Sequence, residues 1–181
     1  MLKRLFSEKK FLYKIQTHKD PEAFAALYDV YVEKIYRFVF LKLSHKQEAE
    51  DVTSEIFLKA WNYLTDPTKG SVTHFSGFIY RIARNVVIDT YRKRATQQQV
   101  SIADMQEIQD TKDLLSEIEI KHDAERILAA LHKLKSQYQE VIVFKYIDQL
   151  STAEIAEILG KNKTAVRVTL HRAIKTLKNI L

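Results

Sequence analysis

The sequence predicts an all-α fold, and three features of its composition and patterning support that prediction. The 181 residues include only three glycines and two prolines, which is too few for the many turns of a β-sandwich or barrel. Apolar residues recur every three or four positions along most of the chain, the spacing of one face of a helix. Residues 96–123 lose this spacing and gain glutamines and acids. We therefore expect two small helical domains, residues 1–95 and 124–181, joined by an acidic linker.

The first two helices of the N-terminal domain are expected from their caps and their apolar stripes. One helix begins with Asp20 as its N-cap and Pro21 at its first helical position. The next begins near Ser44, where Gln47 completes a capping box of the type S-x-x-Q. Their core-facing residues follow helical spacing: Phe24, Leu27, Tyr31, Ile35, Val39 and Leu43 in the first, and Val52, Ile56, Ala60 and Leu64 in the second.

A loop and a third helix complete this domain as an expected three-helix bundle. The loop at residues 65–77 contains a proline and two of the three glycines of the chain. The helix that follows runs from about residue 76 to residue 94, and the sequence does not decide whether residues 3–19 are ordered. The third core stripe consists of Ile79, Ile82, Ala83, Val86 and Val87.

Charge alternates along the chain in blocks. Residues 1–20 carry a net charge of +4, residues 71–100 carry +4 and residues 126–181 carry +6, whereas residues 101–125 carry −6. Basic blocks on either side of an acidic block predict two surfaces that bind a polyanion. Solvated helix faces would produce the same charges, so charge alone leaves both interpretations open.

Composition also excludes several classes of protein. The chain has no cysteine, which excludes disulfides and thiolate metal sites and fits a reducing compartment. Its glycines are not clustered, so neither phosphate-cradling glycine-rich motif is present. No apolar run approaches the roughly 18 residues that a membrane-spanning helix needs, and charges interrupt the basic start. We expect a soluble cytoplasmic protein that needs no cofactor and does not insert into a membrane.

The last two helices predict a helix-turn-helix, because their charges differ while both have helical spacing. The first of them opens with Ser151 and Glu154 as a capping box and ends at Gly160, which supplies a left-handed turn. The second buries one stripe and leaves a basic face free, the arrangement of a recognition helix in the major groove. Helical hairpins with a basic face also occur without DNA. The buried stripe of the second helix consists of Val166, Leu170, Ala173, Ile174 and Leu177.

Three stretches of the sequence together resemble one known family. LSTAEIAEILGKNKTAVRVTLHRAIKTLK resembles the C-terminal region of extracytoplasmic-function sigma factors, the small members of the bacterial sigma-70 family. EAEDVTSEIFLKAW and FIYRIARNVVIDTYRKR resemble their N-terminal region, in the expected order and spacing. The resemblance implies an alternative sigma factor that joins core RNA polymerase and starts transcription at specific promoters. It also implies an anti-sigma factor as a partner.

The resemblance further implies which residues contact each partner. The N-terminal domain would bind the clamp helices of the largest polymerase subunit through Glu50, Asp51, Ser54, Glu55, Leu58 and Trp61. It would hold melted promoter DNA at the −10 element through Tyr80, Arg81, Arg84, Asn85, Ile88 and Arg92, beside Tyr91. The C-terminal domain would bind the −35 element through Lys161, Lys163, Thr164, Arg167, Val168, His171, Arg172 and Lys175. The acidic linker would thread the positively charged cleft of the polymerase.

The residues of the first surface also have a purely structural interpretation, and two features depart from the family pattern. Acids at the start of the second helix would complement its dipole, and Trp61 would pack in the core. Val168 and Thr169 stand where the family usually has Ser-Arg, so the −35 sequence cannot be inferred. The loop at 65–77 is longer than usual, and Phe78 stands where tryptophan is typical, so base capture at −10 is expected to differ in detail.

Two other classes of protein are alternatives to a sigma factor. An enzyme with a di-iron site would need two E-x-x-H motifs, and the chain has one, at Glu119 and His122. A stand-alone helix-turn-helix regulator would use residues 1–95 to sense a ligand or to dimerise, and only its last domain would bind DNA. Such a regulator would bind an operator without RNA polymerase, which distinguishes it from a sigma factor.

Overall fold

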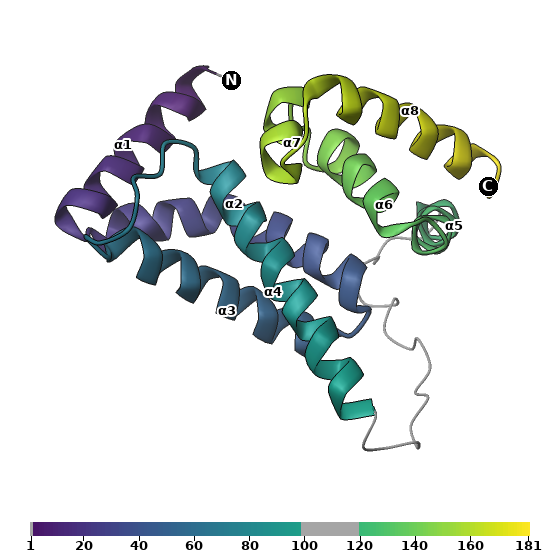
Figure 1. Cartoon of the computed structure of the whole chain (residues 1–181), viewed down its shortest axis with the longest axis horizontal. Coiled ribbons are helices and arrows are strands. Elements are labelled where there is room, and N and C mark those ends of the chain that lie inside the picture. Colours follow the sequence, from purple (N-terminus) through teal and green to yellow (C-terminus); the bar gives the residue numbers. More distant parts are fainter. Residues whose placement is uncertain (1, 99–119) are drawn as a thin grey trace. The chain divides into compact units, whose positions relative to one another are not determined.

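The computed structural model describes the backbone of residues 2–98 and 120–181 and the side chains of residues 7–96 and 126–181. Every regular element in these ranges is helical (Figure 1), which confirms the predicted fold class there. The chain forms two compact units, Met1–Gln106 and Glu107–Leu181. Most of the expected acidic linker lies outside the described residues. None of the helices in the described ranges combines the length and the apolar character needed to cross a bilayer.

The described part of the first unit contains four helices where the sequence predicted three: α1 (Leu2–His18), α2 (Pro21–Leu43), α3 (Lys46–Thr65) and α4 (Phe75–Gln98). The additional helix, α1, packs on both α2 and α3. It is anchored by Leu12 and Ile15, which are buried. Because only a narrow apolar stripe interrupts the lysines of α1, composition alone did not identify it as a helix.

The ends of α2 and α3 confirm one predicted cap and correct another. Asp20 caps α2, accepting hydrogen bonds from the amides of Glu22 (3.0 Å) and Ala23 (3.1 Å), and the bond from Ala23 is the main cause that lowers its pKa. The capping box predicted at Ser44 and Gln47 is wrong. Ser44 instead ends α2 in the left-handed conformation (φ 55°), and an N-cap requires an extended backbone. His45 is extended and caps α3 by accepting from the amide of Glu48 at 3.3 Å.

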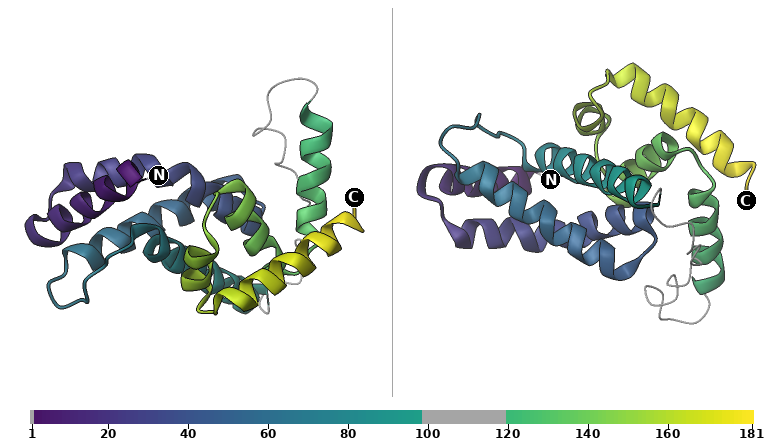
Figure 2. Two further views of the ribbon diagram at one scale, coloured as in Figure 1. Left: turned by 90° about the horizontal axis from the view of Figure 1, so that it is seen from above. Right: turned by 60° about the horizontal axis from the view of Figure 1, so that its bottom comes forward.

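The second unit is built from α5 (Ile120–His132), α6 (Ser136–Ile142), a π-helical turn η1 (Val143–Ile147), α7 (Thr152–Leu159) and α8 (Lys163–Lys178). In Figure 2, α8 runs along α6, and α7 leads into the N-terminal end of α8. Both α6 and α7 pack against α8. The sequence did not predict the π-helical turn. The core of the unit brings together Leu131, Leu134, Val141, Phe144, Ile155, Ile158, Val166 and Ala173.

Helix α7 has the predicted capping groups at both of its ends, and a further cap begins α8. Ser151 and Glu154 form a complete capping box, with the Glu154 carboxylate 2.8 Å from the Ser151 amide. Gly160 ends α7 in the left-handed conformation (φ 62°), and the next amide, that of Lys161, donates to the Ala156 carbonyl at 2.9 Å. Asn162 then caps α8 by accepting from the Ala165 amide at 2.7 Å. These local bonds set the angle at which α8 leaves the turn.

Replacing Gly160 by alanine is expected to destabilise the second unit by about 1 kcal/mol, because an L side chain is strained in the left-handed region. The effect is purely conformational, since no heavy atom lies within 4 Å of the position that the new Cβ would occupy. Urea unfolding of the full chain would measure it. Gly70→Ala is the matched control: this glycine is outside the left-handed region and its Cβ would lie 3.8 Å from the Tyr63 hydroxyl. A Gly160→Ala variant whose second unit is as stable as that of the wild type would contradict the role of the turn.

Candidate nucleic-acid and protein interfaces

The exposed face of α8 is basic and is held in place from its opposite side. Val166 and Ala173 are buried, which fixes the rotation of α8 on its two supporting helices. In the part of the chain that the structure describes, no carboxylate forms an ion pair with a cation of this face. A cation that forms no ion pair within the protein can bind a phosphate without first breaking such a pair. All the residues predicted for this surface are exposed: Lys161, Lys163, Thr164, Arg167, Val168, His171, Arg172 and Lys175.

The predicted residues of α3 share one side of that helix. Glu50, Asp51, Ser54 and Leu58 are exposed, and Leu58 leaves 60% of its surface in solvent. Glu55 is half-buried and pairs with Lys59 at 2.8 Å. The structure therefore presents an exposed leucine among carboxylates, a combination of apolar contact and negative charge that suits a protein partner.

Trp61 has features of both roles that the sequence left open, packing in the core and forming part of an exposed binding surface. Its ring packs edge-on against Phe24 of α2, with ring centroids 5.1 Å apart, so it supports the α2–α3 interface. It is only half-buried, and the remaining surface lies on the same side of α3 as Ser54 and Leu58. Trp61 is thus both a packing residue and part of the exposed side of α3.

On α4, the predicted polar stripe is exposed but one predicted residue is not. Arg81, Asn85, Ile88 and Arg92 are exposed, and Arg84 is half-buried. Tyr80 was predicted beside them and this prediction is wrong, because its side chain is 0% exposed and packs edge-on against Phe38 at 5.9 Å. Tyr80 precedes the buried Ala83 by three residues and Val87 by seven, which places it on the core side of α4. It cannot stack on a nucleic-acid base.

Tyr91 is the aromatic residue that remains beside the α4 stripe. It is partly exposed, its hydroxyl donates to the Lys42 carbonyl of α2, and burial of that end raises its pKa. The hydroxyl is therefore anchored while part of the ring faces solvent. An anchored ring is a better stacking platform than a free one, because less side-chain freedom is lost on binding.

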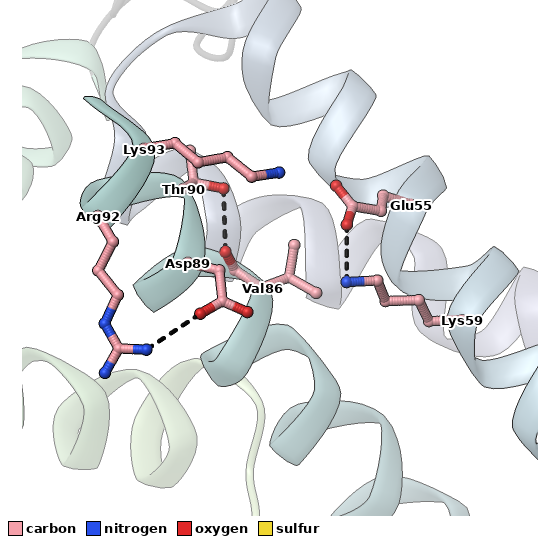
Figure 3. A pocket seen from close by; sticks show the side chains of 7 residues that line it. All are labelled: Glu55, Lys59, Val86, Asp89, Thr90, Arg92 and Lys93. Carbon is pink, nitrogen blue, oxygen red and sulfur yellow. Dashed lines mark hydrogen bonds and ion pairs between the residues drawn. The ribbon is translucent and has the colours of Figure 1, made fainter. Parts of the chain in front are cut away.

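A pocket of about 260 Å³ lies between α3 and α4 (Figure 3). Glu55 pairs with Lys59 across one wall, and Asp89 pairs with Arg92 at 3.3 Å on the other. Lys93 extends toward the α3 side (Figure 3), and it alone of the pocket's cations lacks an ion pair within the described residues. The sequence did not predict this pocket, since its lining comes from two helices that only the fold brings together. It joins the α3 surface to the α4 surface.

The loop between α3 and α4 is fixed at both ends. At its start, Asp66 accepts from the amide and the hydroxyl of Thr68 at 2.9 and 2.7 Å, and these bonds hold the Asp66 pKa below its usual value. At its end, Val72 is buried and Gln16 of α1 binds its backbone. Phe78 belongs to α4 and is buried against Tyr63, with ring centroids 5.0 Å apart. It therefore belongs to the packing of α3 against α4 and is not available to capture a base.

Two family models match the chain, and they correspond to its two units. The model of Sigma-70 region 2 matches residues 27–97, and that of Sigma-70, region 4 matches residues 124–177. The chain is 32% identical over 171 residues to the ECF RNA polymerase sigma factor SigW of Bacillus subtilis, covering 90% of each protein. The chain belongs to the ECF sigma factors of the sigma-70 family. ECF sigma factors direct RNA polymerase to initiate transcription and are not themselves enzymes, so the enzyme and stand-alone regulator alternatives do not apply.

Other relatives extend the comparison. The ECF sigma factor SigX of B. subtilis is 31% identical over 163 residues, with 87% of this chain and 82% of SigX covered. The match to BldN of Streptomyces coelicolor spans 61% of that protein, at 29% identity. Among solved structures, CnrH in complex with the cytosolic domain of CnrY has the same fold (TM-score 0.69, 21% identity, 96% of each chain). RpoE in complex with the anti-sigma factor NepR from Bartonella quintana does as well (TM-score 0.68, 18% identity, 87% of this chain and 95% of that one).

Proposed function

We propose that this ECF sigma factor divides promoter recognition between its two units. Residues 1–95 bind core RNA polymerase through α3 and melted −10 DNA through α4, residues 124–181 bind the −35 element through α8, and residues 96–123 thread the polymerase cleft. The basic face of α8, which forms no ion pair with the described residues and is braced across the Gly160 turn, carries this proposal. Because the polymerase acts on the chromosome, we place the protein in the cytoplasm.

The α8 surface suits the major groove in shape and in charge. A single helix fits that groove with its N-terminal residues nearest the bases. Thr164, Arg167 and Val168 occupy the N-terminal half of the exposed face and are placed to contact base edges. Lys175 lies two turns further along and is placed to contact phosphate. Val168 offers an apolar contact of the kind that a thymine methyl group accepts.

The α3 surface suits a basic helical partner, and we propose that this partner is the clamp helices of the largest polymerase subunit. Leu58 supplies apolar area to bury, and Glu50, Asp51 and Glu55 supply the complementary charge. One solved structure with the same fold was determined with an anti-sigma factor. We propose that this chain also binds an anti-sigma factor, which would compete with the polymerase if it covers the same leucine.

The α4 surface suits single-stranded DNA. Arg81, Arg84 and Arg92 supply cations for the backbone, Asn85 supplies an amide for base edges, and Ile88 supplies apolar contact. With Tyr80 buried, stacking falls to the exposed part of Tyr91, and each stacked base contributes about 1–3 kcal/mol. The mixture of cations, an amide and one anchored ring is what melted DNA requires, since unpaired bases expose both their faces and their edges.

In vitro transcription with sigma-free core polymerase on genomic fragments tests this proposal. The protein should produce transcripts with discrete start sites, and the sequences upstream should share a −10 and a −35 element. Gel shifts with the same fragments should show strong binding only when core polymerase is present. Absence of specific transcripts, or equally strong binding by the protein alone, would overturn the proposal.

Replacing Arg167 and Lys175 separately should distinguish base recognition from phosphate binding on α8. Arg167→Ala is expected to weaken binding to −35 DNA by about 1–3 kcal/mol and to relax the sequence preference at one position. Lys175→Ala should weaken binding to all sequences alike and lower the dependence on log salt by about one. Holoenzyme titrations on promoter DNA at several salt concentrations measure both effects. If neither variant changes −35 binding, α8 is not the recognition helix.

A further inference from the structure

The C-terminal part of α4 contributes no residue to the core of the first unit. Val87 is the last buried residue in the described part of α4, and the side chains of residues 88–96 are all exposed or half-buried. A pocket of about 260 Å³ also separates this segment from α3 (Figure 3). Ile88 and Arg92 of the proposed DNA surface both lie in the segment. Burial of apolar area therefore contributes little to holding that part of the surface in place.

Two polar side chains of this segment instead bind the end of α2. The hydroxyl of Tyr91 donates to the Lys42 carbonyl, and the guanidinium of Arg94 makes a long hydrogen bond, 3.5 Å, to the Leu43 carbonyl. The last carbonyls of a helix have no partner inside it, and a cation near them also interacts favourably with the helix dipole. Because Tyr91 and Arg94 are three residues apart, they project from the same side of α4. Together they hold its C-terminal turns against α2.

Arg94 also pairs with the first turn of α3. Its Nε donates to one carboxylate oxygen of Glu48 at 3.0 Å and its Nη2 donates to the other, so the pair is bidentate. Both side chains are half-buried, and burial lowers the pKa of Arg94. A guanidinium that has lost part of its hydration depends on such a partner, because an unpaired buried charge is costly. This pair joins the end of α4 to the start of α3.

We propose that Arg94, held by Glu48, is a positioning residue for −10 DNA. Its bonds keep the C-terminal turns of α4 in one arrangement, so that Ile88 and Arg92 do not have to be ordered when the strand binds. This inference rests on the proposed function of the first unit, in which α4 binds the melted strand. Arg94 acts through the helix and does not need to touch DNA.

The start of α3 should keep its own structure without this pair. His45 caps the helix by accepting from the Glu48 amide, and Ala49 and Val52 of the next turn are buried. Loss of the pair should therefore disturb the end of α4 more than the exposed side of α3. This difference separates positioning from general destabilisation, because unfolding of the unit would weaken binding to DNA and to polymerase alike.

Glu48→Ala distinguishes positioning from a direct contact of Arg94 with a phosphate. The substitution removes a negative charge and releases Arg94, so a direct contact would make the holoenzyme bind DNA more tightly. Positioning predicts the opposite, a loss of about fivefold in affinity for the −10 strand, which corresponds to about 1 kcal/mol for a half-exposed ion pair. Fluorescence anisotropy measures it, with holoenzyme and a labelled single strand that carries the −10 element mapped by transcription. A strand with that element scrambled gives the background.

Variants of Arg94 provide a second test. Arg94→Lys keeps the positive charge but loses the bidentate pair, so it should bind the strand as weakly as Glu48→Ala does. Adding Glu48→Ala to Arg94→Met should cause no further loss, since both changes remove the same interaction. Hydrogen exchange at the amides of residues 92–96 should rise in every one of these variants, because these amides belong to the turns that the pair holds. Affinity for core polymerase should stay unchanged.

Glu33→Ala is the matched control. Glu33 pairs with Arg37 at 2.7 Å within α2, so the variant removes the same charge from an ion pair within a single helix and should not weaken −10 binding. If wild-type holoenzyme does not prefer the −10 strand to the scrambled one, the proposed function fails and this inference fails with it. If the wild type shows the preference and either Glu48→Ala or Arg94→Lys binds as tightly, this inference alone is overturned. An equal loss in Glu33→Ala, or a parallel loss of polymerase affinity, would also contradict it.

Discussion

Leu58→Asp is expected to weaken the binding of core RNA polymerase at least about a hundredfold. Leu58 is 60% exposed in the free chain, and burying the remainder of a leucine side chain at an interface contributes up to about 1.5–3 kcal/mol. The substitution loses this contribution and places an additional carboxylate beside Glu55, where it would be buried without a partner. A hundredfold change corresponds to about 2.8 kcal/mol. Titration of labelled variant into core polymerase, read by fluorescence anisotropy, measures it.

Val30→Asp is the matched control for this prediction. Val30 is also an exposed apolar residue in a helix of the first unit, 43% exposed, but it lies on α2. The same acid there should leave polymerase affinity unchanged. Both variants should retain the wild-type circular dichroism spectrum, because neither side chain is in the core. A Leu58→Asp variant that binds the polymerase as tightly as the wild type would remove α3 from the interface.

Sequence patterns identified the elements whose causes are local. The Asp20 cap, the capping box of Ser151 with Glu154, and the left-handed Gly160 are each determined by residues within one helical turn. The exposed face of α8 could be predicted for the same reason, since one buried stripe fixes which side of a helix faces solvent. These are also the elements that build the proposed −35 surface, so that surface could be predicted from sequence residue by residue.

The features that the sequence did not predict all depend on contacts between distant segments. Serine is a residue type that favours the N-cap of a helix, but α2 continues to Leu43, so Ser44 ends α2 and does not begin α3. Tyr80 has an aromatic ring that could stack on a base, but the ring is buried against Phe38 of α2. Glu8 and Gln16 look like solvent-exposed residues of a charged segment until the fold brings Val72 and Phe75 beside them. Polar residues of this kind carry no periodic signal, and their partners become visible only in three dimensions.

Phe144→Ala is expected to unfold the second unit and leave the first unit folded. Phe144 is completely buried at the π-helical turn, and removal of a buried phenylalanine side chain costs about 3–5 kcal/mol. The core of so small a unit rarely supplies more than about 3–5 kcal/mol in total. Because the chain forms two separate compact units, the loss should not spread to α1–α4. Two-dimensional NMR of the full chain would show collapsed signals for residues 126–181 and unchanged signals for residues 7–96.

The functional consequence of Phe144→Ala follows from the same separation. Polymerase binding and −10 recognition should persist, since α3, α4 and the loop belong to the intact unit, while dependence on the −35 element should disappear. Tyr146→Ala is the control, because Tyr146 lies in the same turn but is 58% exposed and should leave both units folded. Simultaneous loss of polymerase binding in Phe144→Ala would show that the units depend on each other for stability. The −10 and −35 contacts could then not be assigned to separate units by this variant, because unfolding of one unit would also disable the other.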